Sequence, residues 1–302
     1  MVVGIDIGSR TVKTVFLRNG EIDDARVKPG GSDPYEVALS LLRHYPRCPV
    51  AATGYGRHGL KEGETKADLV ITEIKAHALG ARYLFPSCRT VIDVGGQDSK
   101  VIALDASGQF TNFQMNDKCA AGTGKFLEVM AQSLGYDMDT FSRVGLGEVE
   151  PVPINSMCTV FAESEVISLV SRRVDKAAIV RGLHEAMANR IASMANRVGV
   201  VKDVVFSGGV ARNPTIVELL RKRLKADIKV PEAPDIVGAL GAALAVEGLK
   251  RRRSQRLTRM SALDSLMSRD RDQRNRVVGK KILKRKVLYF SRAMSEGGKR
   301  DE

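Results

Sequence analysis

The sequence has few aromatic residues and no long apolar run. No stretch of about 18 or more apolar residues occurs in its 302 positions, which excludes a transmembrane helix. Aromatic residues make up 5% of the chain, and neither a zinc finger, an RNP-like motif nor basic–aromatic interleaving is present, so a specific nucleic-acid interface is not expected. Residues 1–30 lack the pattern of a signal peptide, and we therefore expect a cytoplasmic protein.

Cysteine is also scarce, and its spacing is not that of a zinc site. The four cysteines, Cys48, Cys88, Cys119 and Cys158, include no C-x-x-C pair, and the four histidines are not spaced to complete a ligand set. Disulfides are not expected in a cytoplasmic chain. Spacing alone therefore predicts that all four thiols are structural.

Two common nucleotide-binding signatures are missing. The run Gly122-Thr123-Gly124-Lys125 is similar to the end of a P-loop, but Cys119 stands where that motif needs glycine and Phe126 where it needs Ser or Thr. No G-x-G-x-x-G follows the first expected strand. The sequence thus favours neither a P-loop nor a dinucleotide-binding fold.

The net charge of +13 is concentrated at one end of the chain. Residues 250–302 hold 18 of the 48 Lys and Arg but only 6 of the 35 Asp and Glu, so residues 1–249 are nearly neutral. We expect this basic tail to be a solvated extension with at most one short helix. Docking to an acidic partner protein, or contact with nucleic acid or an anionic membrane, remains an alternative.

The rest of the chain alternates short strands with helices and begins twice in the same way. Asp6-Ile7-Gly8 and Asp93-Val94-Gly95 each end an apolar strand, and each is followed by a polar loop, a lysine and a second strand. This weak duplication predicts an α/β fold of two similar lobes, residues 1–88 and 89–249, with a cleft between them. Helices are expected at 36–44, 71–84, 121–134, 158–172, 175–198, 213–225 and 236–248.

Three glycine loops follow expected strands and offer phosphate chemistry. In the first, Ser9 and Thr11 supply hydroxyl donors, Lys13 supplies a positive charge, and Asp6 is suited to hydrated Mg²⁺. The second loop, at 93–98, repeats the Asp and Gly of the first. The third, at 207–211, is suited to lie against an adenine or ribose. Each loop alone is also consistent with a plain β-turn, but the ordered set of three predicts a nucleotide site.

These loops, in this order, resemble the actin, Hsp70 and sugar kinase superfamily. That resemblance implies two RNase H-like lobes with a nucleotide cleft between them. Further stretches are similar to the ATP-dependent activators of 2-hydroxyacyl-CoA dehydratases, a family that includes the ATPase subunits of benzoyl-CoA reductase. The resemblance covers roughly residues 1–248, and the stretches that carry it are Ile5–Ser9 with Lys13, Thr53–Arg57, Ile92–Asp98, Asn112–Gly124, Cys158–Val166, Gly208–Ala211 and Gly238–Ala243.

The resemblance implies an ATP-hydrolysing enzyme and assigns roles to residues of the loops. Asp6 and Asp93 would bind hydrated Mg²⁺, and Gln97 or Asp98 would orient the hydrolytic water. Arg10 departs from the family, in which this position more often carries a small residue. The expected contacts to ATP or ADP are Ser9, Arg10, Thr11, Val12, Lys13, Gly95, Gly96, Gly122, Gly124, Gly208, Gly209 and Asn213.

Two cysteines acquire a second interpretation from their surroundings. Cys119 and Cys158 stand at the starts of expected helices, where the dipole favours an anionic ligand. The resemblance implies one [4Fe–4S] cluster that bridges a homodimer through these two residues of each chain, while Cys48 and Cys88 stay structural thiols.

The implied partners are a dehydratase or reductase component with its own iron–sulfur cluster, and a ferredoxin or flavodoxin that donates the electron. The alternatives are a small-molecule kinase of the same fold and a non-catalytic ATP sensor.

Overall fold

The computed structural model describes residues 1–61, 66–155, 158–252 and 255. The chain divides into two units, residues 1–247 and 248–302. Of the second unit, residues 248–252 and 255 are described, and they are helical. The expectations for the basic tail therefore fall almost entirely outside the described residues. Within the described part of the chain, no helix combines the length and apolar character needed to cross a bilayer.

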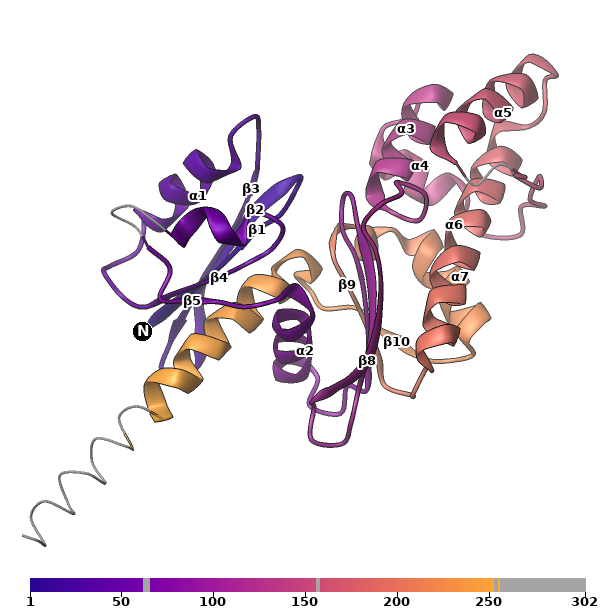
Figure 1. Ribbon diagram of the computed structural model, residues 1–302. Coiled ribbons are helices and arrows are strands. Elements are labelled where there is room, and N and C mark those ends of the chain that lie inside the picture. Colours follow the sequence, from indigo (N-terminus) through magenta and orange to yellow (C-terminus); the bar gives the residue numbers. More distant parts are fainter. Residues whose placement is uncertain (62–65, 156–157, 253–254, 256–302) are drawn as a thin grey trace, which may run out of the picture. The chain divides into compact units, whose positions relative to one another are not determined.

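The first unit begins with a five-stranded mixed sheet in the order β3-β2-β1-β4-β5 (Figure 1). Asn19 and Gly20 form the tight turn between β2 and β3, and both have the positive φ that such a turn requires, 56° and 92°. We call this sheet and its loops the first lobe. Its elements are β1 (Val2–Ile7), β2 (Thr11–Arg18), β3 (Glu21–Pro29), α1 (Pro34–Leu42), β4 (Val50–Thr53), the 3₁₀ turn η1 (Arg57–Lys61) and β5 (Leu69–Val70).

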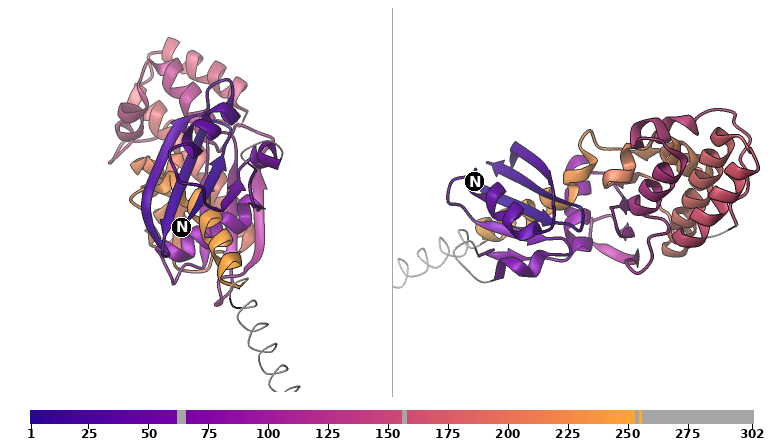
Figure 2. Two further views of the ribbon diagram at one scale, coloured as in Figure 1. Left: turned by 90° about the vertical axis from the view of Figure 1, so that its left-hand side faces the viewer. Right: turned by 90° about the horizontal axis from the view of Figure 1, so that it is seen from above.

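A helix then leads to a second sheet with the order β10-β9-β6-β7-β8. We call this sheet, with the helices α3 to α7, the second lobe (Figures 1 and 2). The elements are α2 (Glu73–Leu84), β6 (Thr90–Val94), β7 (Ser99–Leu104), β8 (Phe110–Asn116), α3 (Gly124–Leu134), α4 (Met138–Val144), α5 (Thr159–Ser171), α6 (Lys176–Val198), β9 (Val204–Ser207), the 3₁₀ turn η2 (Gly209–Arg212), α7 (Pro214–Leu224), β10 (Ile228–Lys229) and the 3₁₀ turn η3 (Pro234–Ile236).

The two sheets repeat one topology, which confirms the duplication. In each, the first strand pairs antiparallel with the second and parallel with the fourth. Asp6 lies opposite Lys13 across β1 and β2, and Asp93 lies opposite Lys100 across β6 and β7. The same Asp–Lys pair therefore stands at the same edge of both sheets.

A helix over residues 237–247 returns to the first sheet and completes its core. Ala239, Leu240, Ala242 and Ala243 are fully buried there. Side chains at Gly4 and Gly241 would overlap the backbones of Ala239 and Ala76, respectively, so small residues are needed for this close approach. The run Gly238–Ala243 thus packs the helix against the sheet and α2.

The expected helix starts differ from those observed by one to three residues. The helix expected from 121 begins at Gly124 after Thr123, and the one expected from 71 begins at Glu73 because Thr72 caps it with its side chain. The helix expected from 213 begins at Pro214, with Asn213 as its cap. In addition, α4 has no counterpart among the expected elements, since its seven residues are too few to show a clear periodicity.

Candidate functional site

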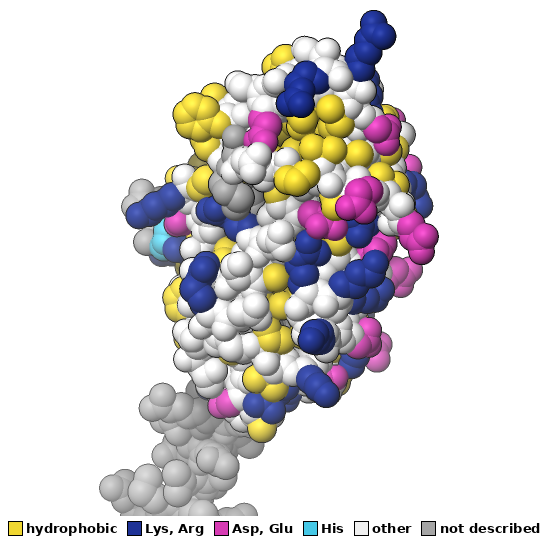
Figure 3. All heavy atoms as spheres, turned by 90° about the vertical axis from the view of Figure 1, so that its right-hand side faces the viewer, with side chains coloured by type: hydrophobic (Ala, Val, Ile, Leu, Met, Phe, Trp, Pro, Cys, Tyr) yellow, Lys and Arg dark blue, Asp and Glu magenta, His cyan; other side chains and the backbone are white. Residues whose placement is uncertain are grey.

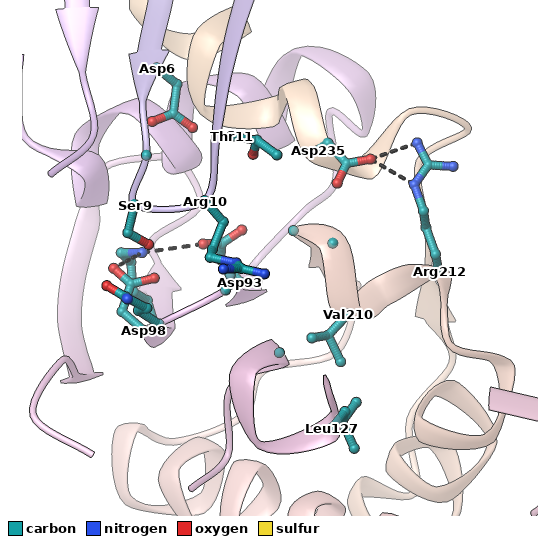
Figure 4. Close-up of a pocket in the computed structure, with 18 of the residues that line it drawn as sticks. Asp6, Ser9, Arg10, Thr11, Asp93, Asp98, Leu127, Val210, Arg212 and Asp235 are labelled. Atoms are coloured by element: carbon teal, nitrogen blue, oxygen red, sulfur yellow. Dashed lines mark hydrogen bonds and ion pairs between the residues drawn. The ribbon is translucent and has the colours of Figure 1, made fainter. Parts of the chain in front are cut away.

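A cavity of about 520 Å³ opens where the two sheets present their Asp–Lys pairs. This volume falls in the usual range for small-molecule sites. Figure 4 shows Asp6, Ser9 and Thr11 on one side of the cavity, and Val210 and Leu127 on the other. The cavity therefore lies between loops of the first lobe and loops and helices of the second.

The first loop holds a buried ion pair at the floor of the cavity. Lys13 Nζ donates to Asp6 Oδ2 at 3.2 Å, and the turn is closed by the Gly8 N–H, which donates to the Thr11 carbonyl. Burial disfavours the charged lysine, but the adjacent Asp6 outweighs it and raises the pKa of Lys13. Lys13 thus remains a cation close to any bound phosphate.

The second loop holds a denser cluster around one buried lysine. Lys100 Nζ lies 2.7 Å from Glu73, 2.7 Å from Asp98 and 3.4 Å from Asp93, and its side chain is 2% exposed. Burial opposes the charge, but the three carboxylates raise the pKa of Lys100 above its ordinary value. Burial also raises the pKa of Asp98. One buried lysine therefore contacts three carboxylates, and Arg57 lies 3.9 Å from one of them, Glu73.

His77 on α2 lies beside this cluster. Its Nδ1 is 3.3 Å from Asp93 Oδ1 without hydrogen-bond geometry, and among the described residues that nitrogen has no hydrogen-bond partner. Although burial opposes ionisation of Asp93, His77 and Lys100 outweigh it and lower the pKa of Asp93. The imidazole is thus a buried polar group beside Asp93, and His77 contributes to the wall of the cavity.

The third loop forms the opposite end of the cavity. Gly208 has φ of 85°, and a side chain there would overlap the Val94 carbonyl, so glycine is required. Ser207 donates to Asp93 Oδ1 at 2.8 Å, which ties this loop to the second one. Arg212 pairs with Asp235 at the rim (Figure 4).

Asn213 reaches the cavity while it caps a helix. Its Oδ1 accepts from the Ile216 N–H at the start of α7. His184 Nδ1 contacts the Val180 carbonyl, to which it must donate, so its Nε2 accepts from the Asn213 amide at 2.9 Å. The buried imidazole fixes which way the Asn213 amide points.

The buried His184 should make the stability of the fold depend on pH. Burial lowers the pKa of His184 to about 4, below the ordinary value of about 6.5. The unfolded chain therefore binds the proton first, and the free energy of unfolding should fall by about 3 kcal/mol as the pH falls from about 6.5 to 4. Urea unfolding of His184→Gln should show a flatter pH dependence over this window. The exposed His44→Gln is the control, and equal slopes for His184→Gln and the wild type would contradict the prediction.

Most of the predicted nucleotide residues line the cavity, but two do not. Val12 is fully buried in the core of the first lobe, because it alternates along β2 with Thr11 and Lys13, which face the cavity. Gly122 packs against Arg190 in the turn before α3. The predicted residues that line the cavity are Asp6, Ser9, Arg10, Thr11, Lys13, Asp93, Gly95, Gly96, Gln97, Asp98, Gly124, Gly208, Gly209 and Asn213.

Several lining residues escaped the sequence analysis. Glu73 and His77 are one turn apart on α2, and this acidic–imidazole spacing on an expected helix was the available signal. Lys100 is the lysine of the second repeat, at the spacing from Asp93 that separates Lys13 from Asp6, but no role in the site was predicted for it. Glu128 and Asp235 left no local pattern, because their elements reach the cavity only through the tertiary fold.

The cysteines predicted as ligands lie in the second lobe, near helices that pack together. Cys158 is exposed and is the N-cap residue of α5, as predicted. Cys119 is half-buried and lies in the loop before α3, so the expected position at a helix start is wrong by about one turn. Ser133 on α3 donates to Glu163 on α5, which joins the two helices.

Within the described part of the chain, no group of three or more His, Cys, Asp or Glu side chains is arranged to hold a metal ion. Two thiols per chain are half of the four thiolates that a [4Fe–4S] cluster takes, so such a cluster would need ligands from a second chain. Mg²⁺ usually takes only one or two carboxylates and fills its shell with water and phosphate oxygens, so Asp6 and Asp93 are compatible with it.

Apolar side chains are exposed on α5, which begins at Cys158. Val160, Phe161 and Ile167 are 67%, 67% and 55% exposed. Figure 3 shows hydrophobic side chains gathered on the corresponding face of the molecule. A surface of this kind is typical of a protein-binding region.

Comparison with known proteins connects the chain to one family. Residues 42–246 match the BadF/BadG/BcrA/BcrD ATPase family. The chain is 45% identical to the (R)-2-hydroxyglutaryl-CoA dehydratase activating ATPase of Acidaminococcus fermentans, over 80% of this chain and 95% of that protein. It is 32% identical to a benzoyl-CoA reductase component of Thauera aromatica, over 80% and 91% of the two chains.

Solved structures support the fold. The activator of 2-hydroxyisocaproyl-CoA dehydratase from Clostridium difficile with bound ADPNP aligns with a TM-score of 0.76 and 41% identity, covering 84% of this chain and 97% of that one. A ROK family glucokinase from Streptomyces griseus aligns with a TM-score of 0.50 and 13% identity, covering 80% and 98%. The second likeness concerns the fold alone, and it confirms the expected two-lobed α/β class.

Proposed function

This chain belongs to the BadF/BadG/BcrA/BcrD ATPase family, and on that premise we propose that it couples ATP hydrolysis to delivery of a low-potential electron to a 2-hydroxyacyl-CoA dehydratase. The observation that carries the proposal is the pairing, in one chain, of the duplicated Asp–Lys cavity with two unpaired thiols, Cys119 and Cys158, beside the packed helices α3 and α5. The higher identity to a dehydratase activator than to the benzoyl-CoA reductase component favours a dehydratase partner.

Different residues of the cavity bind different parts of the nucleotide. Lys13, with the hydroxyls of Ser9 and Thr11, holds phosphate from the first lobe, and the backbone at Gly95 and Gly96 holds it from the second. Gly208 and Gly209 leave space for the nucleoside at the other end. Mg²⁺ bound through water to Asp6 and Asp93 would supply charge neutralisation for the phosphates.

Asp98 and Gln97 are placed at the mouth of the second loop and orient the attacking water. Because burial raises the pKa of Asp98, this carboxyl is a better proton acceptor than an ordinary aspartate. Lys100 holds it in position through a 2.7 Å ion pair. Asp93 keeps its charge because of His77 and Lys100, which suits a ligand for a hydrated cation.

The thiols provide the second half of the function. Cys119 and Cys158 would hold one [4Fe–4S] cluster together with the same two residues of a second copy, and the cluster would supply a one-electron carrier. A homodimer is the simplest assembly that gives four thiolates from two per chain. A ferredoxin or flavodoxin is the electron donor that matches this chemistry, and the partner dehydratase carries its own iron–sulfur cluster.

The decisive experiment measures iron, acid-labile sulfide and ATPase activity on protein purified without oxygen. We expect about two iron atoms per chain, since one four-iron cluster is shared by two chains, together with ATP hydrolysis and loss of iron in air. Iron-free protein after anaerobic reconstitution would contradict the proposal. A phosphorylated sugar or carboxylate product would instead indicate a kinase, and ATP binding without hydrolysis or iron would indicate a sensor.

A further inference from the structure

An ion pair crosses between the lobes at the mouth of the cavity. Arg10 Nη2 donates to Glu128 Oε2 at 2.7 Å, which joins the loop between β1 and β2 to α3. The two side chains are 48% and 33% exposed, and both line the cavity. A pair as exposed as this contributes only about 0–1 kcal/mol to stability, so stabilisation of the fold does not account for its position.

Arg10 rests on the second phosphate loop. A side chain at Gly96 would overlap the aliphatic part of Arg10, so the glycine leaves the space that Arg10 fills. The first turn of α3 is bound to the same loop, because the Gly124 and Lys125 N–H groups donate to the Gly95 and Gly96 carbonyls at 2.9 and 2.8 Å. Glu128, one turn further along α3, is therefore held at a fixed distance from Gly96.

The guanidinium has donors left for a ligand. Arginine carries five N–H groups in a rigid plane, and among the described residues only Glu128 accepts a hydrogen bond from Arg10. Lys125 Nζ lies 3.6 Å from the same carboxylate and offsets part of its charge. The nucleoside end of the cavity is at Gly208 and Gly209, so Arg10, between the two phosphate loops, lies at the end where the terminal phosphate belongs.

We propose that Glu128 is a positioning residue, which holds Arg10 across the lobes so that its remaining donors contact the terminal phosphate of ATP. The inference rests on the nucleotide site of the proposed function and adds a residue that distinguishes ATP from ADP. Without Glu128, the long Arg10 side chain would lose its fixed orientation and would have to be ordered again by each nucleotide. The opposing effect is repulsion between Glu128 and the phosphates, which Lys125 reduces.

A double-mutant cycle on nucleotide affinity tests the proposal. The Kd values for ATP and ADP are measured by calorimetry for the wild type, Arg10→Ala, Glu128→Ala and the double variant. We expect each single change to raise the Kd for ATP about tenfold, the loss of one charge-assisted hydrogen bond, and to change the Kd for ADP less than about twofold. The double variant should be no weaker than Arg10→Ala, because Glu128 acts only through Arg10.

Two further variants complete the design. Glu128→Gln keeps an acceptor for Arg10 and should retain most of the affinity for ATP. Asp24→Ala removes the partner of Arg26 from an equally short and similarly exposed ion pair outside the cavity, and should leave both Kd values unchanged. Thermal unfolding of each variant confirms that it is folded.

The outcomes separate this inference from the function on which it rests. Unchanged or tighter ATP binding in Glu128→Ala, or a roughly hundredfold additive loss in the double variant, would overturn the positioning role while the wild type still binds ATP. A wild-type chain that binds neither nucleotide would overturn the proposed function and this inference with it.

Discussion

Replacement of Lys100 by methionine is expected to lower the free energy of unfolding by about 3–5 kcal/mol and to abolish ATP hydrolysis. Removing one partner of a buried ion pair leaves an uncompensated buried charge, which usually costs about 3–5 kcal/mol of stability. Here the lysine is 2% exposed and faces Glu73, Asp93 and Asp98 together. No other described cation contacts all three carboxylates, so the substitution leaves them to repel one another at the catalytic end of the cavity.

The pH dependence gives this prediction a second signature. In Lys100→Met the three carboxylates should have raised pKa values in the folded state, so their repulsion is relieved when they take up protons. The stability deficit against the wild type should therefore be largest near neutral pH and should shrink as the pH falls toward about 5. Urea unfolding at several pH values measures both effects.

Lys229→Met provides the control for Lys100→Met. Lys229 pairs with Asp203 at 3.1 Å, but the two side chains are 34% and 42% exposed, so the loss should stay below about 1 kcal/mol. If Lys100→Met were as mild as Lys229→Met, the carboxylate cluster would not depend on its lysine, and the proposed roles of Asp93 and Asp98 would lose their electrostatic basis.

The residues around Lys100 also show which parts of the site could be predicted from the sequence. Strand ends and glycine turns are local features, and they placed Asp6, Asp93 and their loops correctly on two similar sheets. Glu73 and His77 come from α2, a helix with no role in the loop pattern, and only the tertiary fold brings them to the cavity. Residues that reach a site from a separate element leave no signature in the motif that defines it.

The errors in the prediction have equally local causes. Val12 is predicted to contact the nucleotide together with Thr11 and Lys13, yet neighbours on a strand face opposite sides of the sheet, and the Val12 side chain is buried in the core. Cys119 is expected at a helix start because a helix is predicted from residue 121, but the chain turns through Gly122 at φ of 84° before α3 begins at Gly124. The alternation of side chains along a strand would have excluded Val12 from the sequence alone. The start of α3 could be corrected only once the backbone conformation at Gly122 was known.

Replacement of Cys158 by alanine is expected to remove the iron completely, from about two atoms per chain to none, while ATP binding changes less than about twofold. In a symmetric dimer one substitution occurs twice, so half of the four thiolates are lost at once. Cys158 is exposed at the N-cap of α5 and does not line the nucleotide cavity. Cys119→Ala should behave in the same way. Iron analysis after anaerobic purification, with ATP affinity measured on the same samples, checks both halves.

Cys88→Ala is the control for Cys158→Ala, because it removes a thiol that is not expected to be a cluster ligand. Cys88 is fully buried, and burial raises the pKa of its thiol to about 11, so it is a poor thiolate donor. Its removal should leave the iron content unchanged while it costs some packing energy. Iron that survives in Cys158→Ala would show that the exposed thiol is not a ligand. The ligands of the cluster would then have to be other residues. The assignment of the nucleotide site would be unaffected, because Cys158 does not line the cavity.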